Sequence, residues 1–331
     1  MFSISEKFNS LFLTGSSGWL GKNILGVFNG NFKELQSSIS TIHTGDLGKS
    51  NMFEENFQKL DLKNKNTIDS FTKKMTTNDI LIHAAGVIHP NNIEDFHKIN
   101  FEGSRYLIEA AKDKLKKIIV ISSNSPIGIS RNKSIFDETS PYNPYMLYGE
   151  SKLKLEKYLL DLIQRNYDIT ILRPPWFYGP FMPDRQYRFY RMIKDGKVPL
   201  VGKGNNLRSK VHLLNLTKAI LLAASNERSK GEIYWIADEK PYSQLEIISI
   251  VRDVLKNRFG IKVQNRNIKV PYFFGDLCEI ADKLLQKFGF YNQSFHVFGE
   301  LNKTIACDIS KIKEHLNYEP IFDFKTGLEQ S

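Results

Sequence analysis

A tight cluster of glycines follows the first apolar run of the chain. Leu11-Phe12-Leu13 has the character of a short buried strand, Gly15, Gly18 and Gly21 come next, and residues 20–28 have helical periodicity. A glycine in the turn can adopt positive φ, a second lets a ligand approach the backbone, and a third lets the helix pack closely on the strand. A pyrophosphate would then face the free N–H groups at the start of the helix. This spacing is typical of a dinucleotide-binding strand, turn and helix.

The rest of the first half alternates short apolar runs with longer helical segments. We expect strands at 39–44, 57–60, 80–83, 117–122 and 168–172, and helices at 100–114 and 144–165. Apolar strands separated by helices indicate a parallel sheet that is covered on both faces. The predicted fold class is therefore α/β, a doubly wound parallel sheet of the Rossmann type, with its ligand beyond the carboxyl ends of the strands.

The pattern loosens after residue 175, where proline, glycine, arginine and aromatic residues accumulate. A helix at 213–224 and a strand at 232–237 are still recognisable, and the last ninety or so residues mix helices with short strands. We therefore expect residues 1–175 and 208–238 to form the dinucleotide-binding domain. Residues 176–207 and 239–331 would form a smaller α+β substrate-binding part.

Composition excludes several classes of protein. The net charge of the 331 residues is +10, but the lysines are scattered among acidic residues, which favours a solvated surface over a nucleic-acid site. The two cysteines cannot form a disulfide framework or a four-cysteine zinc site, so no metal is expected. No apolar run approaches the roughly 20 residues needed to span a bilayer, and the N-terminus is too polar for a signal peptide. We expect a cytoplasmic protein without an integral membrane segment.

Tyr148 and Lys152 stand four residues apart in an expected helix, so their side chains share one face. A lysine ammonium group near a phenol favours the phenolate and lowers the tyrosine pKa, which would make Tyr148 a general acid or base. The strand before this helix ends in Ser122-Ser123, and a serine hydroxyl there could stabilise charge on the same substrate oxygen. Tyr190 and Lys194 have the same spacing, but no such strand precedes them, and an amphipathic surface helix explains this pair.

A dinucleotide site usually carries an acidic residue near the end of the second strand, where it binds the adenosine ribose. Asp46 is the candidate, and Asp61, after the third strand, could accept a hydrogen bond from the adenine amino group. Each could equally be a turn or cap carboxylate. Because no arginine stands at the expected strand end for a 2′-phosphate, we expect NAD, with NADP as the alternative.

These residues together resemble the extended short-chain dehydrogenase/reductase family. The resemblance covers nearly the whole chain and depends on the order of several motifs. They are Thr14–Gly21, His83-Ala84-Ala85-Gly86, Asn100, Val120–Ser123, Leu172-Arg173-Pro174 with Tyr178-Gly179-Pro180, and Asp308–Pro320. The 25-residue step from Ser123 to Tyr148 is similar to that of the family's sugar epimerases, and it favours Ser123 over Ser122, Asn124 or Ser125.

The resemblance implies a set of site residues. The catalytic residues would be Ser123, Tyr148 and Lys152. The cofactor contacts would be Gly15, Ser17, Gly18, Trp19, Leu20, Asp46, Asp61, Leu62, Ala84, Ala85, Gly86, Asn100, Tyr148, Lys152 and Pro174. The substrate contacts would be His89, Ser123, Asn124 and Arg208, with Arg208 as a diphosphate ligand.

The implied function is an NAD(P)-dependent nucleotide-sugar epimerase, dehydrogenase or 4-ketoreductase. Dehydration is disfavoured, because Asn124-Ser125-Pro126 lacks the Thr and Asp-Glu common in dehydratases. Trp176, where related epimerases usually have an asparagine, and Asn215, where sugar enzymes have an aspartate, depart from the pattern. A 3β-hydroxysteroid-type dehydrogenase and a non-catalytic dinucleotide-binding regulator remain as alternatives. The resemblance also implies a homodimer.

Overall fold

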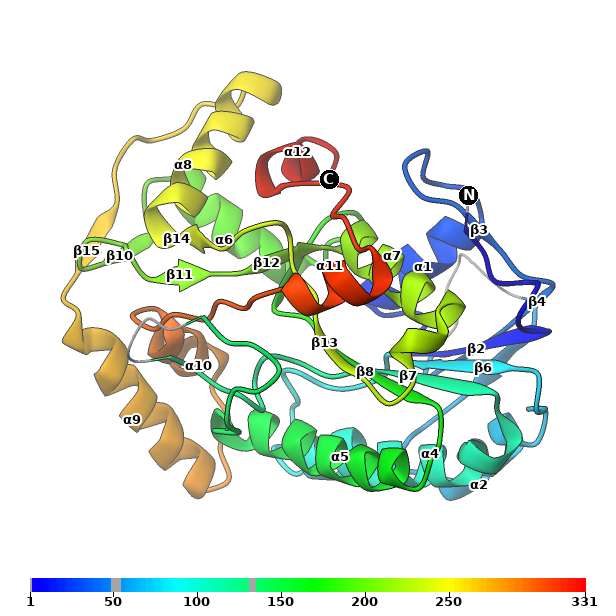
Figure 1. The fold of residues 1–331 in the computed structure, drawn as a ribbon. Coiled ribbons are helices and arrows are strands. Elements are labelled where there is room, and N and C mark those ends of the chain that lie inside the picture. Colours follow the sequence, from blue (N-terminus) through cyan, green and yellow to red (C-terminus); the bar gives the residue numbers. More distant parts are fainter. Residues whose placement is uncertain (1, 49–54, 131–134) are drawn as a thin grey trace.

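The computed structural model describes residues 2–48, 55–130 and 135–331, and its centre is a seven-stranded parallel sheet (Figure 1). The strand order is β13-β8-β7-β6-β2-β4-β5, with every neighbouring pair parallel. The bounds are β2 Ser10–Thr14, β4 Thr41–Asp46, β5 Phe57–Lys59, β6 Ile80–His83, β7 Lys117–Ile121, β8 Ile169–Arg173 and β13 Ile233–Trp235. The expected doubly wound α/β fold is confirmed.

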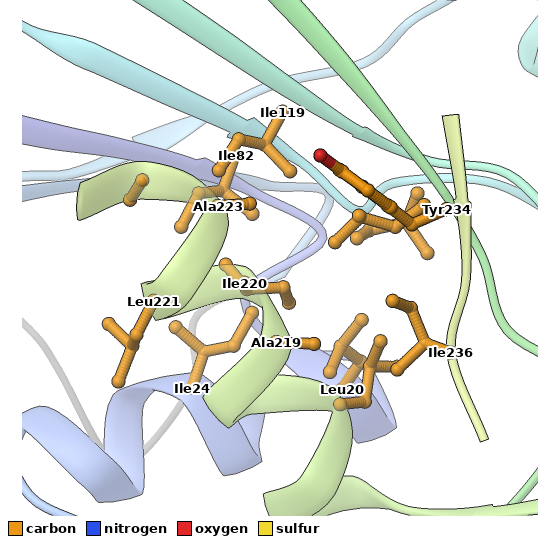
Figure 2. Packing of buried hydrophobic residues seen from close by; sticks show 14 of the residues in the cluster. Leu20, Ile24, Ile82, Ile119, Ala219, Ile220, Leu221, Ala223, Tyr234 and Ile236 are labelled. Atoms are coloured by element: carbon orange, nitrogen blue, oxygen red, sulfur yellow. The ribbon is translucent and has the colours of Figure 1, made fainter. Parts of the chain in front are cut away.

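Helices cover both faces of this sheet (Figure 1). One layer consists of α2 Lys65–Thr72, α4 Ser104–Ala111 and α5 Met146–Gln164, and the other contains α1 Trp19–Phe28, α7 Leu213–Ser225 and α11 Ser310–Leu316. Leu20 and Ile24 of α1 pack with Ala219 and Ile220 of α7 in the core between this second layer and the sheet (Figure 2). The central strands β2, β6, β7 and β8 are buried on both faces, and for this reason they are rich in apolar residues.

The helix expected at 100–114 is interrupted. A π-helical turn, Lys98–Gly103, precedes α4, and a 3-10 turn, Lys112–Lys114, follows it. Gly103 has no room for a side chain, because a Cβ there would lie 2.3 Å from the Leu62 carbonyl oxygen. The π-helical turn contains the buried Asn100, and turns of this kind are frequent at functional sites.

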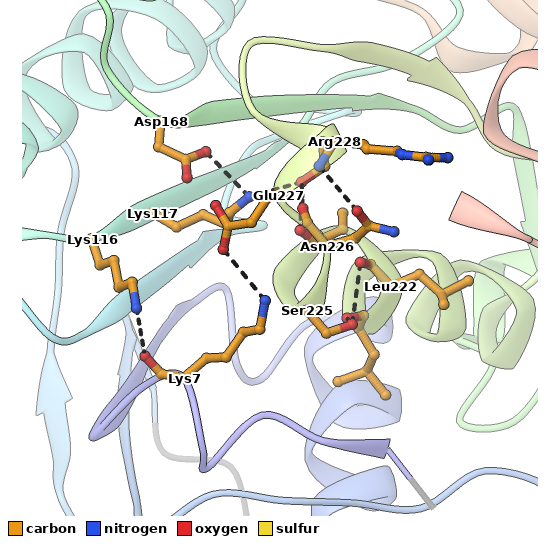
Figure 3. Close-up of polar contacts among 12 residues, drawn as sticks. Lys7, Lys116, Lys117, Asp168, Leu222, Ser225, Asn226, Glu227 and Arg228 are labelled. Carbon is orange, nitrogen blue, oxygen red and sulfur yellow. Dashed lines mark hydrogen bonds and ion pairs between the residues drawn. The ribbon is translucent and has the colours of Figure 1, made fainter. Parts of the chain in front are cut away.

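The amino edge of the sheet is closed by polar contacts (Figure 3). Lys117, at the start of β7, forms an ion pair with Asp168 at 3.2 Å and donates a hydrogen bond to the Ser229 hydroxyl at 2.7 Å. Lys7 pairs nearby with Glu227. Lys117 and Lys7 each have a carboxylate partner here, so this edge of the sheet stabilises the fold. A ligand is expected at the opposite, carboxyl edge.

Most of the remaining elements gather over the carboxyl edge and beyond it (Figure 1), while η3 and the β1–β3 pair lie elsewhere. The short strands pair as β9 with β12, β10 with β15, β11 with β14, and, near the N-terminus, β1 with β3. Their bounds are β1 Phe2–Ser3, β3 Ser37–Ser38, β9 Trp176–Tyr178, β10 Pro199–Val201, β11 Leu207–Arg208, β12 Lys210–His212, β14 Tyr242–Ser243 and β15 Ile268–Val270. The helices are α3 Asp95–His97, α6 Asp184–Lys194, α8 Gln244–Asp253, α9 Phe273–Lys287, α10 Gln293–Glu300 and α12 Phe324–Glu329, with short turns η3 Glu227–Ser229 and η4 Val254–Arg258.

None of the helices in the described ranges combines the length and apolarity needed to cross a bilayer.

Candidate active site

The glycine turn between β2 and α1 packs directly on the end of β6. Gly15 has φ of +76°, and a Cβ there would lie 2.8 Å from the Ala85 nitrogen. A Cβ on Gly21 would lie 2.2 Å from the Gly15 carbonyl oxygen, so no side chain fits at either position. Gly18, the N-cap of α1, provides no side-chain hydrogen bond to the helix. The first amide groups of α1 are therefore available to an anion.

Asp46 closes one side of this turn. Its Oδ2 accepts hydrogen bonds from the Ser17 amide at 2.9 Å and from the Ser17 hydroxyl at 2.7 Å. Because β2 and β4 are neighbours, their carboxyl ends bring residues 29 positions apart into contact. The carboxylate thus lies beside the turn, as expected of a ribose ligand, and its negative charge would oppose a 2′-phosphate.

Lys152 and Asn100 meet over Gly86 at the end of β6. A Cβ on Gly86 would lie 3.1 Å from Asn100 Oδ1 and 3.5 Å from Lys152 Nζ. Asn100 is locked to the loop by two hydrogen bonds of 2.8 Å with the amide and carbonyl of Val87. The glycine turn, the Ala84–Gly86 segment and the Lys152 ammonium group therefore form one continuous wall.

Two adjacent serines at the end of β7 have different environments. The Ser122 hydroxyl donates to Glu156, which is also bound by Arg173. Ser123 lies on the other side, where it accepts a hydrogen bond from the Ser125 amide at 3.2 Å and contacts Tyr148. Since successive residues of a strand point to opposite faces, only one of the pair can face the site.

Tyr148 lies in the first turn of α5, and its ring packs against Phe96 at 5.9 Å between centroids. Burial raises the pKa of its phenol to about 12, although a hydrogen bond with Ser123 opposes the rise. Lys152 Nζ donates to the Ile121 carbonyl at 3.1 Å, and burial lowers the pKa of this lysine to about 8. The expectation that Lys152 lowers the pKa of Tyr148 is wrong for this arrangement.

Aromatic side chains connect Tyr148 with Tyr291, which lies between α9 and α10, through the ring of Phe96. The Tyr291 ring stands 5.5 Å from Phe96, and its hydroxyl hydrogen-bonds His89 Nδ1 at 2.5 Å. Burial, together with the charge of Arg185 on α6, lowers the pKa of His89 to about 4. Sequence reasoning missed Tyr291 and Phe96, because no local pattern signals a contact between residues 202 positions apart.

Arg208 and Lys210 are buried around the Trp176 ring. The Arg208 guanidinium carbon lies 5.0 Å and Lys210 Nζ 4.3 Å from the ring centroid. Arg208 also donates to the backbone carbonyl of Glu300, whose carboxylate is 3.9 Å away from it. Burial, and then the Arg208 charge, lowers the pKa of Lys210 to about 7. Sequence reasoning chose Arg208 and overlooked Lys210.

The other predicted site residues are distributed along the carboxyl edge. The Asp61 carboxylate accepts a hydrogen bond from the Lys63 amide at 2.9 Å, so it caps a turn in this structure. The Asn124 carbonyl accepts two backbone hydrogen bonds, and the Trp19 indole donates to the Pro180 carbonyl at 2.7 Å. Leu20, Leu62 and Pro174 are buried.

These features fit a dinucleotide better than a metal ion. The glycine turn has no side chains that would block a pyrophosphate, and the first amides of α1 can donate hydrogen bonds to it. The Asp46 carboxylate beside the turn can accept a hydrogen bond from a ribose hydroxyl. Among the described residues, no group of three His, Cys, Asp or Glu side chains could hold a metal.

The model of the family described as "NAD dependent epimerase/dehydratase family" matches residues 11–237. The chain belongs to that family. This family member is 38% identical to the uncharacterized protein y4nL of Sinorhizobium fredii, covering 96% of this chain and 93% of that one. It is 24% identical to the N-acetyl-alpha-D-glucosaminyl-diphospho-ditrans,octacis-undecaprenol 4-epimerase of Escherichia coli O157:H7, covering 84% and 80% of the two chains.

The family member also resembles a solved structure, the dTDP-glucose 4,6-dehydratase DesIV of Streptomyces venezuelae with NAD and TYD bound. The TM-score is 0.72 at 20% identity, covering 97% of this chain and 95% of that one. This likeness supports the Rossmann-type fold. The family match supports an enzyme of the NAD-dependent epimerase/dehydratase type.

Proposed function

We propose that the protein catalyses reversible hydride transfer on a sugar bound through a diphosphate, as an NAD-dependent nucleotide-sugar 4-epimerase, dehydrogenase or ketoreductase. The observation that carries this proposal is the continuous wall from the glycine turn through Gly86 to Lys152, with Ser123 and Tyr148 beside it. A cofactor on the turn would extend along this wall toward the phenol.

Each polar side chain has a role in this proposal. Tyr148 Oη exchanges a proton with the substrate oxygen, and the Ser123 hydroxyl orients that oxygen. Bound NAD would supply the hydride acceptor. With a pKa of about 12, Tyr148 is protonated at neutral pH and is poised to donate to a carbonyl oxygen. Lys152, one turn along the same helix, would bind the nicotinamide ribose of the cofactor and hold it beside the phenol.

The diphosphate assignment rests on the buried positive charge of Arg208 and Lys210. Arg208 and Lys210 place two positive charges around Trp176, and arginine suits a diphosphate geometrically. A cavity of about 190 Å³ lies beside the strand of Arg208 and is lined by Lys203, Asn205 and Tyr272, among others. Its polar groups and its aromatic ring are suited to a nucleotide. The relative from Escherichia coli also has a diphospho-sugar in its name.

The proton-transfer role is tested by Tyr148→Phe, with Tyr190→Phe as a matched control. Both tyrosines precede a lysine by four residues on a helix, but Tyr148 hydrogen-bonds with Ser123 at the end of β7, whereas Tyr190 packs with the apolar residues of α6 and α8. We expect Tyr148→Phe to lower turnover by roughly 10²- to 10⁴-fold while NAD binding persists, and Tyr190→Phe to retain turnover. Unchanged turnover in Tyr148→Phe would remove this residue from the mechanism.

The substrate class is tested by thermal shift with UDP-, GDP- and dTDP-sugars and with a sterol alcohol. A specific ligand raises the unfolding temperature because it binds only the native state. We expect stabilisation by one nucleotide-sugar class, whereas stabilisation by the sterol alone would favour the hydroxysteroid-type alternative. Cofactor that remains bound through purification would indicate epimerisation, and freely exchanging cofactor would indicate net oxidation or reduction.

A further inference from the structure

Helix α9 carries its apolar residues on the outside. Phe273, Leu277, Ile280, Leu284 and Phe288, here called the α9 stripe, recur at intervals of three or four and are between 51% and 72% exposed. Side chains at this spacing lie on one face of a helix. A contiguous exposed apolar face of this kind marks an interaction site more often than a free surface.

The two polar side chains buried on the inner face of α9 are hydrogen-bonded. Asp282 binds His296 of α10 at 2.8 Å, and the Gln286 side-chain oxygen accepts a hydrogen bond from the Leu147 amide at 3.1 Å. The helix is therefore anchored to α10 and α5 through hydrogen bonds. These contacts determine the orientation of the helix, and the stripe side chains are exposed to solvent. The helix itself lies at the outer edge of the molecule (Figure 1).

The acidic and basic residues of α9 also differ in their exposure to solvent. The carboxylates of Asp276 and Glu279 form ion pairs with Lys303, and Asp282 is buried. The two lysines of the helix, Lys283 and Lys287, are exposed and flank the stripe. The exposed lysines border the stripe, and the half-exposed Asp276 carboxylate beside it is paired with Lys303. A face of this composition is complementary to an anionic lipid surface, and its lysines would repel those of an identical face on a second copy.

We propose that the α9 stripe docks on an anionic membrane surface, with the helix lying in the interface. Two features besides the stripe fit this geometry. α9 is too short and too charged to span a bilayer, and exposed Phe290 continues the apolar face beyond the end of the helix.

Docking would bring the lipid surface toward Tyr148. Tyr291 follows the stripe by three residues and reaches Tyr148 through the Phe96 ring. The proposal does not require the reaction inferred above, since a membrane-docked protein with any activity would use the same face.

Vesicle flotation of the full-length protein tests the proposal. The vesicles contain either phosphatidylcholine alone or equal parts of phosphatidylcholine and phosphatidylglycerol. The test variant is Leu277→Ser/Leu284→Ser, and the matched control is Leu245→Ser/Ile268→Ser, which removes two other exposed apolar side chains on α8 and β15. We expect the wild type and the control to float with the phosphatidylglycerol vesicles. The stripe variant should bind at least about tenfold more weakly, since each inserted leucine contributes to binding.

The charge is tested separately by Lys283→Gln/Lys287→Gln. This variant should lose roughly tenfold in affinity for the anionic vesicles, and binding should fall with added salt. Unfolding temperature and NAD binding, measured for every variant, show that the fold is intact, and Tyr148→Phe should still float.

Three results would overturn the proposal. They are wild-type protein that does not float, a folded stripe variant that floats like the wild type, and lysine substitutions without effect on anionic vesicles. If light scattering shows instead that the stripe variant converts a dimer into a monomer while flotation is absent throughout, the face is an interface between copies.

Discussion

Two buried groups of positive charge in this protein both lie over aromatic rings, but they differ in the carboxylates that neutralise them. Arg173, at the end of β8, lies over the rings of Tyr142 and Trp235 and is bound by the Glu156 carboxylate at 2.6 Å. Arg208 and Lys210 also lie over an aromatic ring. However, the Glu300 carboxylate is 3.9 Å from Arg208, and no carboxylate in the described part of the chain forms an ion pair with Lys210.

The difference separates a structural group from a binding group. A buried charge with a hydrogen-bonded partner is satisfied by the fold itself, whereas an incompletely matched charge keeps part of its desolvation cost. That residual cost is reduced when an anion binds. We therefore interpret the Glu156–Arg173 pair as part of the fold and the Arg208–Lys210 pair as part of the substrate site.

Breaking the structural pair should have the largest effect. Glu156→Gln keeps the shape of the side chain but leaves Arg173 buried without its counter-charge, so we expect about 3–5 kcal/mol less unfolding free energy. Urea denaturation measures this loss. The exposed Glu150→Gln on the same helix is the control and should stay within about 0.5 kcal/mol of the wild type. A loss below about 1 kcal/mol for Glu156→Gln would contradict the structural assignment.

Removing the unmatched lysine should stabilise the protein. Burial lowers the pKa of Lys210 from 10.5 to about 7, so the unfolded state binds a proton more tightly than the folded state does. Wild-type stability should therefore rise between pH 7 and about 10. Lys210→Met should abolish this rise and add on the order of 3 kcal/mol at or below pH 7.

The pH dependence of urea denaturation checks this prediction, with the exposed Lys203→Met as control. A gain that does not diminish toward pH 10 would show that packing, and not the buried charge, is responsible.

Replacing the arginine should mainly affect binding. Arg208→Met is expected to weaken affinity for a nucleotide-sugar by roughly 10- to 100-fold, because charge-assisted hydrogen bonds to phosphate are lost. Calorimetry with the best ligand from the thermal-shift screen measures this. The exposed Arg188→Met on α6 should bind normally. If both variants bind equally well, Arg208 belongs to the structural class, like Arg173.

The sheet was largely predictable because its signals are local. The strand expected at 80–83 is β6 itself, and the strand expected at 117–122 differs from β7 by one residue. The helix at 100–114 was predicted without its π-helical turn, since that irregularity accompanies the approach of Gly103 to the backbone of Leu62, a contact with a distant segment.

The candidate site was only partly predictable. Ser123, Tyr148 and Lys152 were identified by spacing and motif order, and the structure brings them to the same edge of the sheet. The pKa of Tyr148 was predicted in the wrong direction, because burial and the hydrogen bond of Lys152 to the Ile121 carbonyl cannot be read from an i, i+4 spacing.

Glycine spacing and apolar periodicity were enough to determine the glycine turn and the parallel sheet, since each depends on residues within about one helix or strand length. The order of motifs along nearly the whole chain was enough to determine the family type. The tertiary structure alone decided that Lys210 lies over the Trp176 ring and that Tyr291 packs on Phe96 beside Tyr148. It also decided that the apolar face of α9 is exposed. The physical reason is that burial and charge pairing depend on segments far apart in the chain, and no local pattern states which of them will meet.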